Sequence, residues 1–363
     1  MKIGILSMQK IPNYGSFLQA LSLKVQLEKR GHDVYFIDIE RGRQIVSAPA
    51  AVSKASLLRK FDRYFFKRIA NYFFYKKMLD LHTADHVKYL ETEKKLPEGE
   101  CFDLVIIGSD EVFNATVPSS WGFSTQLFGK IDNAGKVVTY AASCGSTTLD
   151  SAKACGIVDE LRAAMANLAA VSVRDQNTVD FVKGVCEKTP ELHVDPVFLT
   201  QYEYPEKPIQ RKPYLLVYAY ANRIDDKHEI RAIKDYAQKH KLEIVSVGMQ
   251  QRWCNHNITA SAFELLEYVK NAACVVTDTF HGTVFSIKYN KRFVTLIRES
   301  NRNKLGGLLQ YFGLMSRALT SPADIETVMA GDVDYSLVNA KIEAEQQRAY
   351  AYLDFVIKEA EKQ

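Results

Sequence analysis

Short apolar segments alternate with longer amphipathic segments along most of the chain. Some of the short segments, including Leu104–Ile107 and Cys274–Val276, are apolar on both faces, as in strands that helices cover on two sides. This pattern predicts an α/β protein with doubly wound parallel sheets. The nine expected strands are Lys2–Met8, Asp33–Glu40, Phe102–Asp110, Lys136–Cys144, Ala170–Asp175, Tyr214–Tyr220, Leu242–Met249, Cys274–Thr279 and Arg292–Arg298.

Nine strands in 363 residues fit two sheets better than one, so the sequence predicts two Rossmann-like domains. We place the division between Met165 and Val171, which gives a first domain of residues 1–168 and a second of residues 169–335. The polar, proline-containing stretch Thr200–Pro213 is the alternative division. Residues 336–363 have a charged helical pattern, and we expect this helix to pack back on the first domain.

A basic aromatic segment interrupts this alternation and predicts a helical insertion near residues 54–90. Residues 54–77 hold eight Lys or Arg and one acid, Asp62, and apolar residues from Leu58 to Tyr72 recur at helical spacing. Such a helix either lies on an anionic membrane surface or packs its apolar stripe on the protein with its lysines in water. The sequence leaves both interpretations open.

Composition and charge exclude several classes of protein. With 47% hydrophobic and 25% charged residues, the chain is neither disordered nor a disulfide-stapled miniprotein. The longest uncharged stretch, residues 112–129, is too polar to span a bilayer. A net charge of +4 suits anionic small molecules or a membrane surface better than nucleic acid.

The chain start and the cysteines indicate the compartment. Met1–Ser7 is typical of a strand rather than a signal peptide, because polar Gln9 and Lys10 follow a short apolar run. The six cysteines are scattered without a Cys-x-x-Cys pair, which favours reduced thiols. We therefore expect a cytoplasmic protein, either free or peripheral at the inner face of the membrane.

Reactive side chains follow four of the expected strands, at the ends where α/β sheets bind ligands. The most concentrated group is Thr277–Thr283, which follows an apolar strand and begins a helix. The N–H groups of a helix start favour an anion, and Gly282 permits a phosphate to approach the backbone. His281 can hydrogen-bond this anion or deliver a proton. A capped helix with a structural histidine is the alternative.

The three other turns are less specific. Arg174 lies at a strand end, where it either grips a carboxylate or phosphate or forms a surface ion pair. In Gly108–Asn114, Ser109 and Asp110 either cap the following turn or, for Asp110, offer a base toward a hydroxyl. The turn Pro12–Phe17 lacks the Gly-x-Gly-x-x-Gly pattern, which disfavours a dinucleotide site.

No metal or other cofactor is expected. His82 and His86 have the spacing of zinc ligands on a helix, but no His-Glu-x-x-His motif is present and no third ligand is evident. Paired histidines on a helix surface are common enough that this spacing alone is a weak signal.

Taken in order, the motifs resemble those of the polysaccharide pyruvyl transferase family. The matching elements are Asn13-Tyr14-Gly15 with Leu18–Leu21, Gly108–Asp110 with Phe113-Asn114, Tyr140–Ser143 with Gly145, Ser172–Asp175, Val194–Val197, Thr277–Thr283 with Phe285-Ser286, and Lys304–Leu309 with Gly313-Leu314. They run from residue 13 to about 319, and their order is more specific than any one motif. The resemblance implies a fold like the GT-B glycosyltransferases, with two Rossmann-like domains facing a cleft.

The family resemblance also implies an activity. It is the transfer of the pyruvyl group of phosphoenolpyruvate onto two hydroxyls of one sugar in a surface or capsular polysaccharide precursor, leaving a cyclic ketal and phosphate. Phosphoenolpyruvate carries about two to three negative charges near pH 7, because the second phosphate pKa is ~6. It needs a cationic pocket, an acid for its enol carbon and a base for the hydroxyls. The acceptor is a sugar or a lipid-linked oligosaccharide.

Roles for individual residues follow from the same resemblance. His281 is the acid or a phosphate ligand, and Asp110, on the opposite domain beside the acceptor, is the base. The residues expected to bind substrate are Arg174, Thr279, Phe280, Gly282, Thr283, Asn13, Gly15, Ser109 and Lys304, with Arg298 and Arg302 as reserve cations.

The sequence departs from the family pattern at two positions. Some members carry an arginine at the position of Thr279, and the late motif more often carries arginine where Lys304 stands. Lys288 or Arg302 can supply the lost charge. Lysine neutralises a phosphate, though without the planar fork of arginine.

Two other functions remain as alternatives. One is a GT-B glycosyltransferase that uses a nucleotide sugar, which needs acidic residues near the ribose that the second sheet does not evidently supply. The other is a non-catalytic glycan-binding relative. Stabilisation by phosphoenolpyruvate, by UDP or by neither distinguishes the three.

Overall fold

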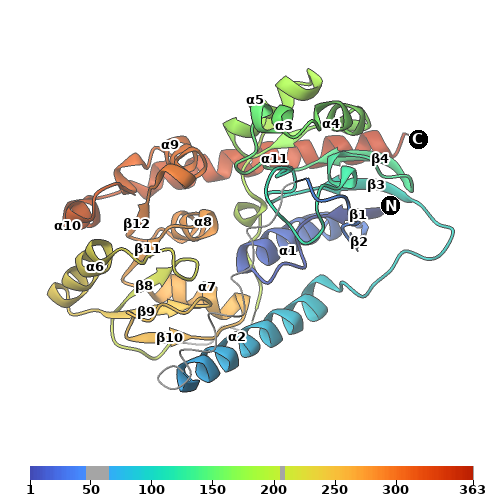
Figure 1. Ribbon diagram of the computed structural model, residues 1–363. Coiled ribbons are helices and arrows are strands. Elements are labelled where there is room, and N and C mark those ends of the chain that lie inside the picture. Colours follow the sequence, from blue (N-terminus) through green and yellow to red (C-terminus); the bar gives the residue numbers. More distant parts are fainter. Residues whose placement is uncertain (46–64, 205–208, 363) are drawn as a thin grey trace.

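The computed structural model describes residues 1–45, 65–204 and 209–362, which form two α/β units and a long C-terminal helix (Figure 1). A five-stranded and a six-stranded parallel sheet lie at the centres of the two units, which confirms the predicted two-sheet α/β fold. Residues 54–64 of the expected helical insertion lie outside the described residues.

The first sheet is covered by helices on both faces. It contains β1 (Lys2–Leu6), β2 (Asp33–Ile37), β3 (Phe102–Ile107), β4 (Ala134–Thr139) and β5 (Leu168–Ala170), in the order β2-β1-β3-β4-β5, with α1 (Tyr14–Glu28), α3 (Leu149–Ala154), α4 (Val158–Met165) and α5 (Gln176–Cys186) around it. In β3, Leu104 and Ile106 belong to the core that includes α1. Val105 and Ile107 belong to the core that includes α4 and α5, so both faces are apolar.

The first unit extends further along the chain than the predicted boundary. The division expected between residues 168 and 169 falls inside β5. The short strands β6 (Ser172–Val173) and β7 (Glu191–Leu192) follow, and Val173 forms a bridge with Ala142. Helix α5 packs its apolar face into the core of the first sheet. The change of unit therefore falls after residue 195, nearer the stretch that the sequence offered as the alternative.

The second sheet has the strand order of a Rossmann fold. It contains β8 (Tyr214–Tyr218), β9 (Glu243–Val247), β10 (His256–Ile258), β11 (Cys274–Thr277), β12 (Phe293–Leu296) and β13 (Ala318–Leu319), in the order β10-β9-β8-β11-β12-β13. Its helices are α6 (Lys227–Lys239), α7 (Ala262–Asn271), α8 (Phe280–Lys288), α9 (Gly307–Tyr311) and α10 (Ile325–Ala330). The first sheet has the flavodoxin-like order instead, and both orders are doubly wound.

Helix α11 (Tyr335–Ala360) runs from the second unit across to the first (Figure 1). Its Tyr352 hydroxyl donates to the Thr139 carbonyl at the end of β4 (2.8 Å). A single buried cluster also extends from β1 and α1 through the 3-10 turn Pro196–Leu199 to α7 and α8. This shared apolar core fixes the two sheets relative to one another.

Helix α2 (Phe65–Asp85) packs on the protein from Met78 onward and exposes the aromatic residues Tyr72, Phe73 and Tyr75. Met78 contacts the Tyr14 hydroxyl through its sulfur, and Asp85 accepts the Ala262 N–H at the start of α7 (2.9 Å). Tyr72, which the sequence assigns to an apolar stripe, is 63% exposed. None of the described helices has the length and apolarity needed to cross a membrane.

Acid is expected to destabilise the fold through three buried histidines. Burial lowers the pKa of His82, His86 and His193 from 6.5 to about 4. Between these values the unfolded chain binds protons that the folded chain does not, so the free energy of unfolding decreases as the pH falls. Each histidine contributes about 1.4 kcal/mol for each unit by which its pKa is lowered. Urea unfolding measured across this interval tests the expectation.

A matched variant isolates one of these histidines. His86 stacks on Phe17, with ring centroids 5.4 Å apart, so His86→Phe preserves an aromatic contact and removes a titrating group. The variant is expected to lose less stability than the parent protein over the same pH interval. Equal losses in the two proteins would contradict the assignment.

Candidate active site

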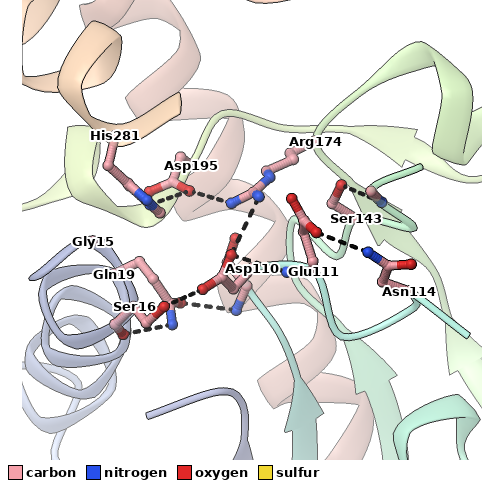
Figure 2. A network of polar contacts seen from close by, with 12 residues as sticks. Gly15, Ser16, Gln19, Asp110, Glu111, Asn114, Ser143, Arg174, Asp195 and His281 are labelled. Atoms are coloured by element: carbon pink, nitrogen blue, oxygen red, sulfur yellow. Dashed lines mark hydrogen bonds and ion pairs between the residues drawn. The ribbon is translucent and has the colours of Figure 1, made fainter. Parts of the chain in front are cut away.

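The ends of strands from the two sheets meet at a junction between the units. Strand order reverses between β1 and β3 and again between β8 and β11, and open α/β sheets bind ligands at the carboxyl ends of strands at such points. Asn13, before α1, donates from Nδ2 to the hydroxyl of Tyr220, after β8 (3.1 Å). The residues drawn in Figure 2 lie at this junction and form the candidate site.

His281 lies against the start of α1. A Cβ atom added to Gly15 would overlap the imidazole at Nδ1, so only glycine leaves room for the ring. On its other side, His281 Nε2 lies 3.4 Å from Asp195 Oδ2. This distance is long for a hydrogen bond, but such contacts often tighten when a substrate binds. The ring is therefore held between a helix start of the first unit and a buried carboxylate.

The start of α8 is organised by hydrogen bonds within the protein. Thr279 caps the helix, and its Oγ1 accepts the Gly282 N–H (3.0 Å). A Cβ atom on Gly282 would overlap the Thr277 hydroxyl, so packing against protein atoms already requires a glycine here. Thr283 is fully buried and donates to the Thr279 carbonyl (3.0 Å). Among the expected ligand-binding residues of this turn, Phe280 and His281 are those that contact the ionic groups of the junction.

Arg174 is the centre of a buried ionic network (Figure 2). Its side chain is 1% exposed, and Nη1 donates to Asp195 Oδ2 (2.8 Å), the oxygen that His281 also approaches. Nη2 lies 3.4 Å from Asp110 Oδ1. The arginine of the first unit and the histidine of the second thus share one carboxylate oxygen, from the chain segment that connects the units.

The charges of this network fix the ionisation of its carboxyl groups. Burial acts to raise the pKa of Asp195, but His281 and Arg174 outweigh it and lower that pKa to about 2. Burial also opposes ionisation of Asp110, whose pKa is nevertheless lowered by Arg174, His281 and Lys304. Both groups are carboxylates at neutral pH.

Asp110 is well placed but is held as a weak base. Its Oδ2 accepts a hydrogen bond from the Ser16 hydroxyl, and its Oδ1 accepts one from the N–H of the next residue, Glu111 (3.0 Å). Hydrogen bonds and cations that stabilise a carboxylate reduce its tendency to take up a proton. An anion that draws Arg174 away from Asp110 would restore that tendency.

Ser109, in contrast, is used inside the first unit. Its side chain is fully buried and donates to the Ala141 carbonyl (2.8 Å), and its N–H donates to Gln19 Oε1 (3.1 Å). These bonds tie the end of β3 to α1 and position the next residue, Asp110. Asn13 has both kinds of role, because its Oδ1 accepts the Gly15 N–H (2.8 Å) as the cap of α1 while its Nδ2 contacts Tyr220.

Two cations flank the ring of Phe280. The Arg174 guanidinium carbon lies 4.2 Å from the ring centroid and Lys304 Nζ lies 5.0 Å from it. Lys304 also forms an ion pair with Glu111 of the first unit. Phe280 therefore orients two positive groups from different units toward the same space.

That space is a cavity of about 380 Å³ between the two units. Its wall includes Arg174, Phe280, Asn303 and Lys304, and its size is that of a small-molecule site. A larger hollow of about 780 Å³, around Lys136, lies at the opposite edge of the first sheet and contains none of the residues above. The smaller cavity is the better candidate because both cations line it.

The reserve cations lie elsewhere. Arg298 pairs with Glu229 (2.5 Å) and approaches Asp278 (3.5 Å), in a separate cluster. Lys288 lies at the far end of α8 and donates to the Thr200 carbonyl (2.9 Å). Arg302 is exposed. Of the expected cations, Arg174 and Lys304 are the ones that line the space beside Phe280.

Asp195, Ser16 and Glu111 are members of the network that the sequence did not assign. Asp195 lies within Val194–Val197, a motif that carries part of the family resemblance. The sequence therefore held a signal that could have assigned Asp195 to the site. Within the described ranges, no three His, Cys, Asp or Glu side chains are placed to hold a metal ion. His82 and His86 pack instead beside Tyr14 and Phe17.

Comparison with known sequences agrees with the motifs. A model of the family described as polysaccharide pyruvyl transferase matches residues 13–300. No curated protein sequence matches the chain.

Comparison with solved structures identifies the fold. Arabidopsis thaliana UGT89C1 complexed with UDP superposes with a TM-score of 0.50 at 10% identity, over 99% of each chain. Spinosyn rhamnosyltransferase SpnG gives 0.49 at 11% identity, over 98% of this chain and 100% of that one. E. coli heptosyltransferase WaaC with ADP gives 0.39 at 16% identity, over 85% and 90%. The similarity to UGT89C1, together with the two doubly wound parallel sheets, confirms the predicted GT-B-like architecture.

Proposed function

Because the chain belongs to the polysaccharide pyruvyl transferase family, a family of transferases, we propose that it moves the pyruvyl group of phosphoenolpyruvate onto two hydroxyls of one sugar. The sugar belongs to a precursor of a surface or capsular polysaccharide. The observation that carries the proposal is the meeting of Arg174 and His281, from different units, on the same oxygen of Asp195. This arrangement joins an anion-binding group to a proton donor.

The donor binds in the cavity beside Arg174 and Lys304. Its phosphate and carboxylate compete with Glu111 for Lys304 and with Asp110 for Arg174. The contact of Arg174 with Asp110, at 3.4 Å, is longer than its contact with Asp195. Arg174 keeps its contact to Asp195 and so stays oriented. A fixed cation of this kind binds an anion at little cost in reorganisation.

The reaction then requires one proton donor and one acceptor. His281 gives a proton to the methylene carbon, which becomes the methyl group, and the positive centre formed at the adjacent carbon is attacked by the first hydroxyl. The second hydroxyl attacks the same carbon, and the bond between this carbon and the phosphate oxygen breaks. Of the two hydroxyl protons, one replaces the proton given to carbon and one leaves with phosphate. Asp110 accepts a hydroxyl proton, and Asp195 compensates the charge of the protonated imidazole.

Phosphate release in the presence of phosphoenolpyruvate and candidate saccharides tests the reaction directly. Thermal unfolding with either phosphoenolpyruvate or UDP separates the alternatives, because a ligand that binds the folded state raises its unfolding temperature. Stabilisation by phosphoenolpyruvate supports the proposal. Stabilisation by UDP alone supports a nucleotide-sugar glycosyltransferase, and stabilisation by neither supports a glycan-binding protein without this activity.

Replacing Arg174 with lysine is expected to weaken the apparent affinity for phosphoenolpyruvate about 10–100-fold, because the fork that contacts Asp195 and the donor together is lost. Titration calorimetry measures the change. The matched control is Arg231→Lys, at an arginine that is 84% exposed and paired with Asp235. An unchanged affinity in the Arg174 variant would remove this residue from donor binding.

Helix α2 offers a surface suited to an anionic membrane, and we propose that it makes a peripheral membrane contact. Tyr72 and Phe73 are 63% and 61% exposed, and Lys76 and Lys77 are exposed next to them. Aromatic residues beside lysines are typical of helices that lie at an anionic lipid interface. Such a contact brings the enzyme to a lipid-linked acceptor.

The protein is expected to float with liposomes that contain phosphatidylglycerol and to remain behind with phosphatidylcholine alone. Tyr72→Ser combined with Phe73→Ser is expected to abolish flotation, because it removes the inserted rings. Phe355→Ser is the control, since Phe355 is 54% exposed on α11. Equal flotation of the double variant and the parent would assign α2 to packing only.

A further inference from the structure

A second cavity lies at the carboxyl ends of β1 and β2, in the first unit. Its volume is about 410 Å³, and it is lined by the segment Ser7–Pro12, by Asp38 and Arg41 after β2, and by Trp121. This is the size of a site for one or two sugar rings. None of the residues given roles in donor binding lines it.

Gln9 supplies an unused hydrogen-bond acceptor in the wall of this cavity. Its side chain is 1% exposed, and Nε2 donates to the Ile37 carbonyl (3.0 Å). Its Oε1 has no hydrogen-bond partner among the described residues. A buried amide oxygen without a donor costs free energy, and a ligand hydroxyl at this position removes that cost.

Trp121 and the charged residues of the wall indicate what else the ligand contains. The Trp121 carbonyl accepts a hydrogen bond from the Gly42 N–H (2.8 Å), which holds Trp121 in the same wall as Arg41. An indole next to polar groups suits a sugar ring, which has apolar faces and polar edges. Lys10 pairs with Asp38 (2.5 Å), whereas Arg41 is exposed and forms no ion pair within the described part of the chain. The wall therefore has an excess of positive charge.

The cavity lies beside residues of the candidate active site. Ser7 lines it and donates to the Ser109 carbonyl (3.0 Å), one residue before Asp110. Pro12 lines it as well as a small hollow that Asn13, Tyr220 and Thr279 share. A saccharide seated on Trp121 thus lies on the side of the junction where Asp110 is placed.

We propose that this cavity binds a saccharide that carries an anionic group, with Gln9 accepting a sugar hydroxyl, Trp121 contacting the ring and Arg41 binding the anion. The inference rests on the proposed function in one respect, because it makes this saccharide the pyruvyl acceptor. The anion is a phosphate, as in a sugar linked to lipid or nucleotide through phosphate, or the carboxylate of an acidic sugar. Both present the same charge to Arg41.

Fluorescence titration measures binding without any turnover. The chain has two tryptophans, so Trp253→Phe leaves Trp121 as the reporter. Glucose 1-phosphate, glucuronate and glucose are the probes, with inorganic phosphate as the anion without a sugar. We expect a saturable change with at least one of the two anionic sugars and an affinity for glucose about tenfold weaker. Which anionic sugar binds better identifies the source of the anion.

Two substitutions assign the contacts. Gln9→Met preserves length and apolar packing, and is expected to weaken binding of all three sugars about tenfold through the lost hydrogen bond. Arg41→Gln is expected to remove the preference for anionic sugars while leaving glucose unchanged. Arg252→Gln, at an exposed arginine of the second unit, is the control and is expected to change neither.

Failure of this inference and failure of the proposed function give different results. Sugar binding with the expected variant effects, but without phosphate release from phosphoenolpyruvate, contradicts the proposed function alone. Phosphate release whose acceptor KM is the same in Gln9→Met, Arg41→Gln and the parent contradicts the acceptor cavity alone. No saturable change with any sugar, or binding of inorganic phosphate as tight as that of glucose 1-phosphate, also overturns the cavity's assignment.

Discussion

Replacing His281 with alanine is expected to slow phosphate release from phosphoenolpyruvate about 10²–10⁴-fold, which is the usual contribution of one positioned acid. The expectation follows from the position of the ring between Gly15 and Asp195, where a protonated imidazole has its charge compensated. The measurement uses whichever saccharide supports turnover in the parent protein. Cooperative urea unfolding of the variant shows that it remains folded.

Gly15→Ala tests the same role without removing the histidine. The added Cβ overlaps Nδ1, so the ring must leave its position, and activity is expected to fall to a similar extent. The double variant should be no slower than His281→Ala, because the two changes disable one group. Gly306→Ala is the control, since its Cβ would meet only Arg302 Cγ at 4.0 Å. A His281→Ala protein as fast as the parent would exclude the imidazole from the reaction.

Asp195→Asn is expected to lower the free energy of unfolding by about 3–5 kcal/mol, because it leaves the buried charge of Arg174 without its shorter partner. Urea unfolding at neutral pH measures the loss. Asp354→Asn is the matched control. That aspartate also pairs with an arginine, Arg30, but is 63% exposed, so its loss is expected to cost less than about 1 kcal/mol.

The same variant predicts a pH dependence. The pKa of Asp195 is lowered from 3.8 to about 2, so its contribution to stability is complete above the higher value and is lost as the pH falls toward the lower one. The parent and the Asn variant are therefore expected to converge in stability in strong acid. A constant difference between them down to that pH would contradict the ionic role of Asp195.

Strand prediction worked where a strand was long and buried on both faces. The expected segments contain β3, β8, β9, β11 and β12 within their bounds, because short apolar runs of this kind are typical of strands covered on two sides. The strands β7, β10 and β13 were missed, since they have two, three and two residues. The early division at residue 168 arose because the expected strand Ala170–Asp175 was assigned to the second domain, whereas β5 and β6 belong to the first unit.

The site was predictable in part by the rule that ligands bind at strand ends. That rule selected His281, Arg174 and Asp110, and the structure brings these three into one network around Asp195. It also selected Ser109, Gly282 and Thr283. The hydroxyls of Ser109 and Thr283 donate to backbone carbonyls, and protein atoms surround Gly282 closely. The sequence does not distinguish the two groups, because both follow strands and only the distant partners differ.

The division of the ionic network between the two units has a consequence for the history of the protein. The guanidinium, the carboxylate and the imidazole come from positions 174, 195 and 281, while the glycine that makes room for the imidazole is at position 15. A recombination that replaced one half of the gene with an unrelated half would separate the imidazole of His281 from the glycine that makes room for it. It would also separate the buried guanidinium of Arg174 from its carboxylate. The network therefore forms only when the residues of the two halves match one another.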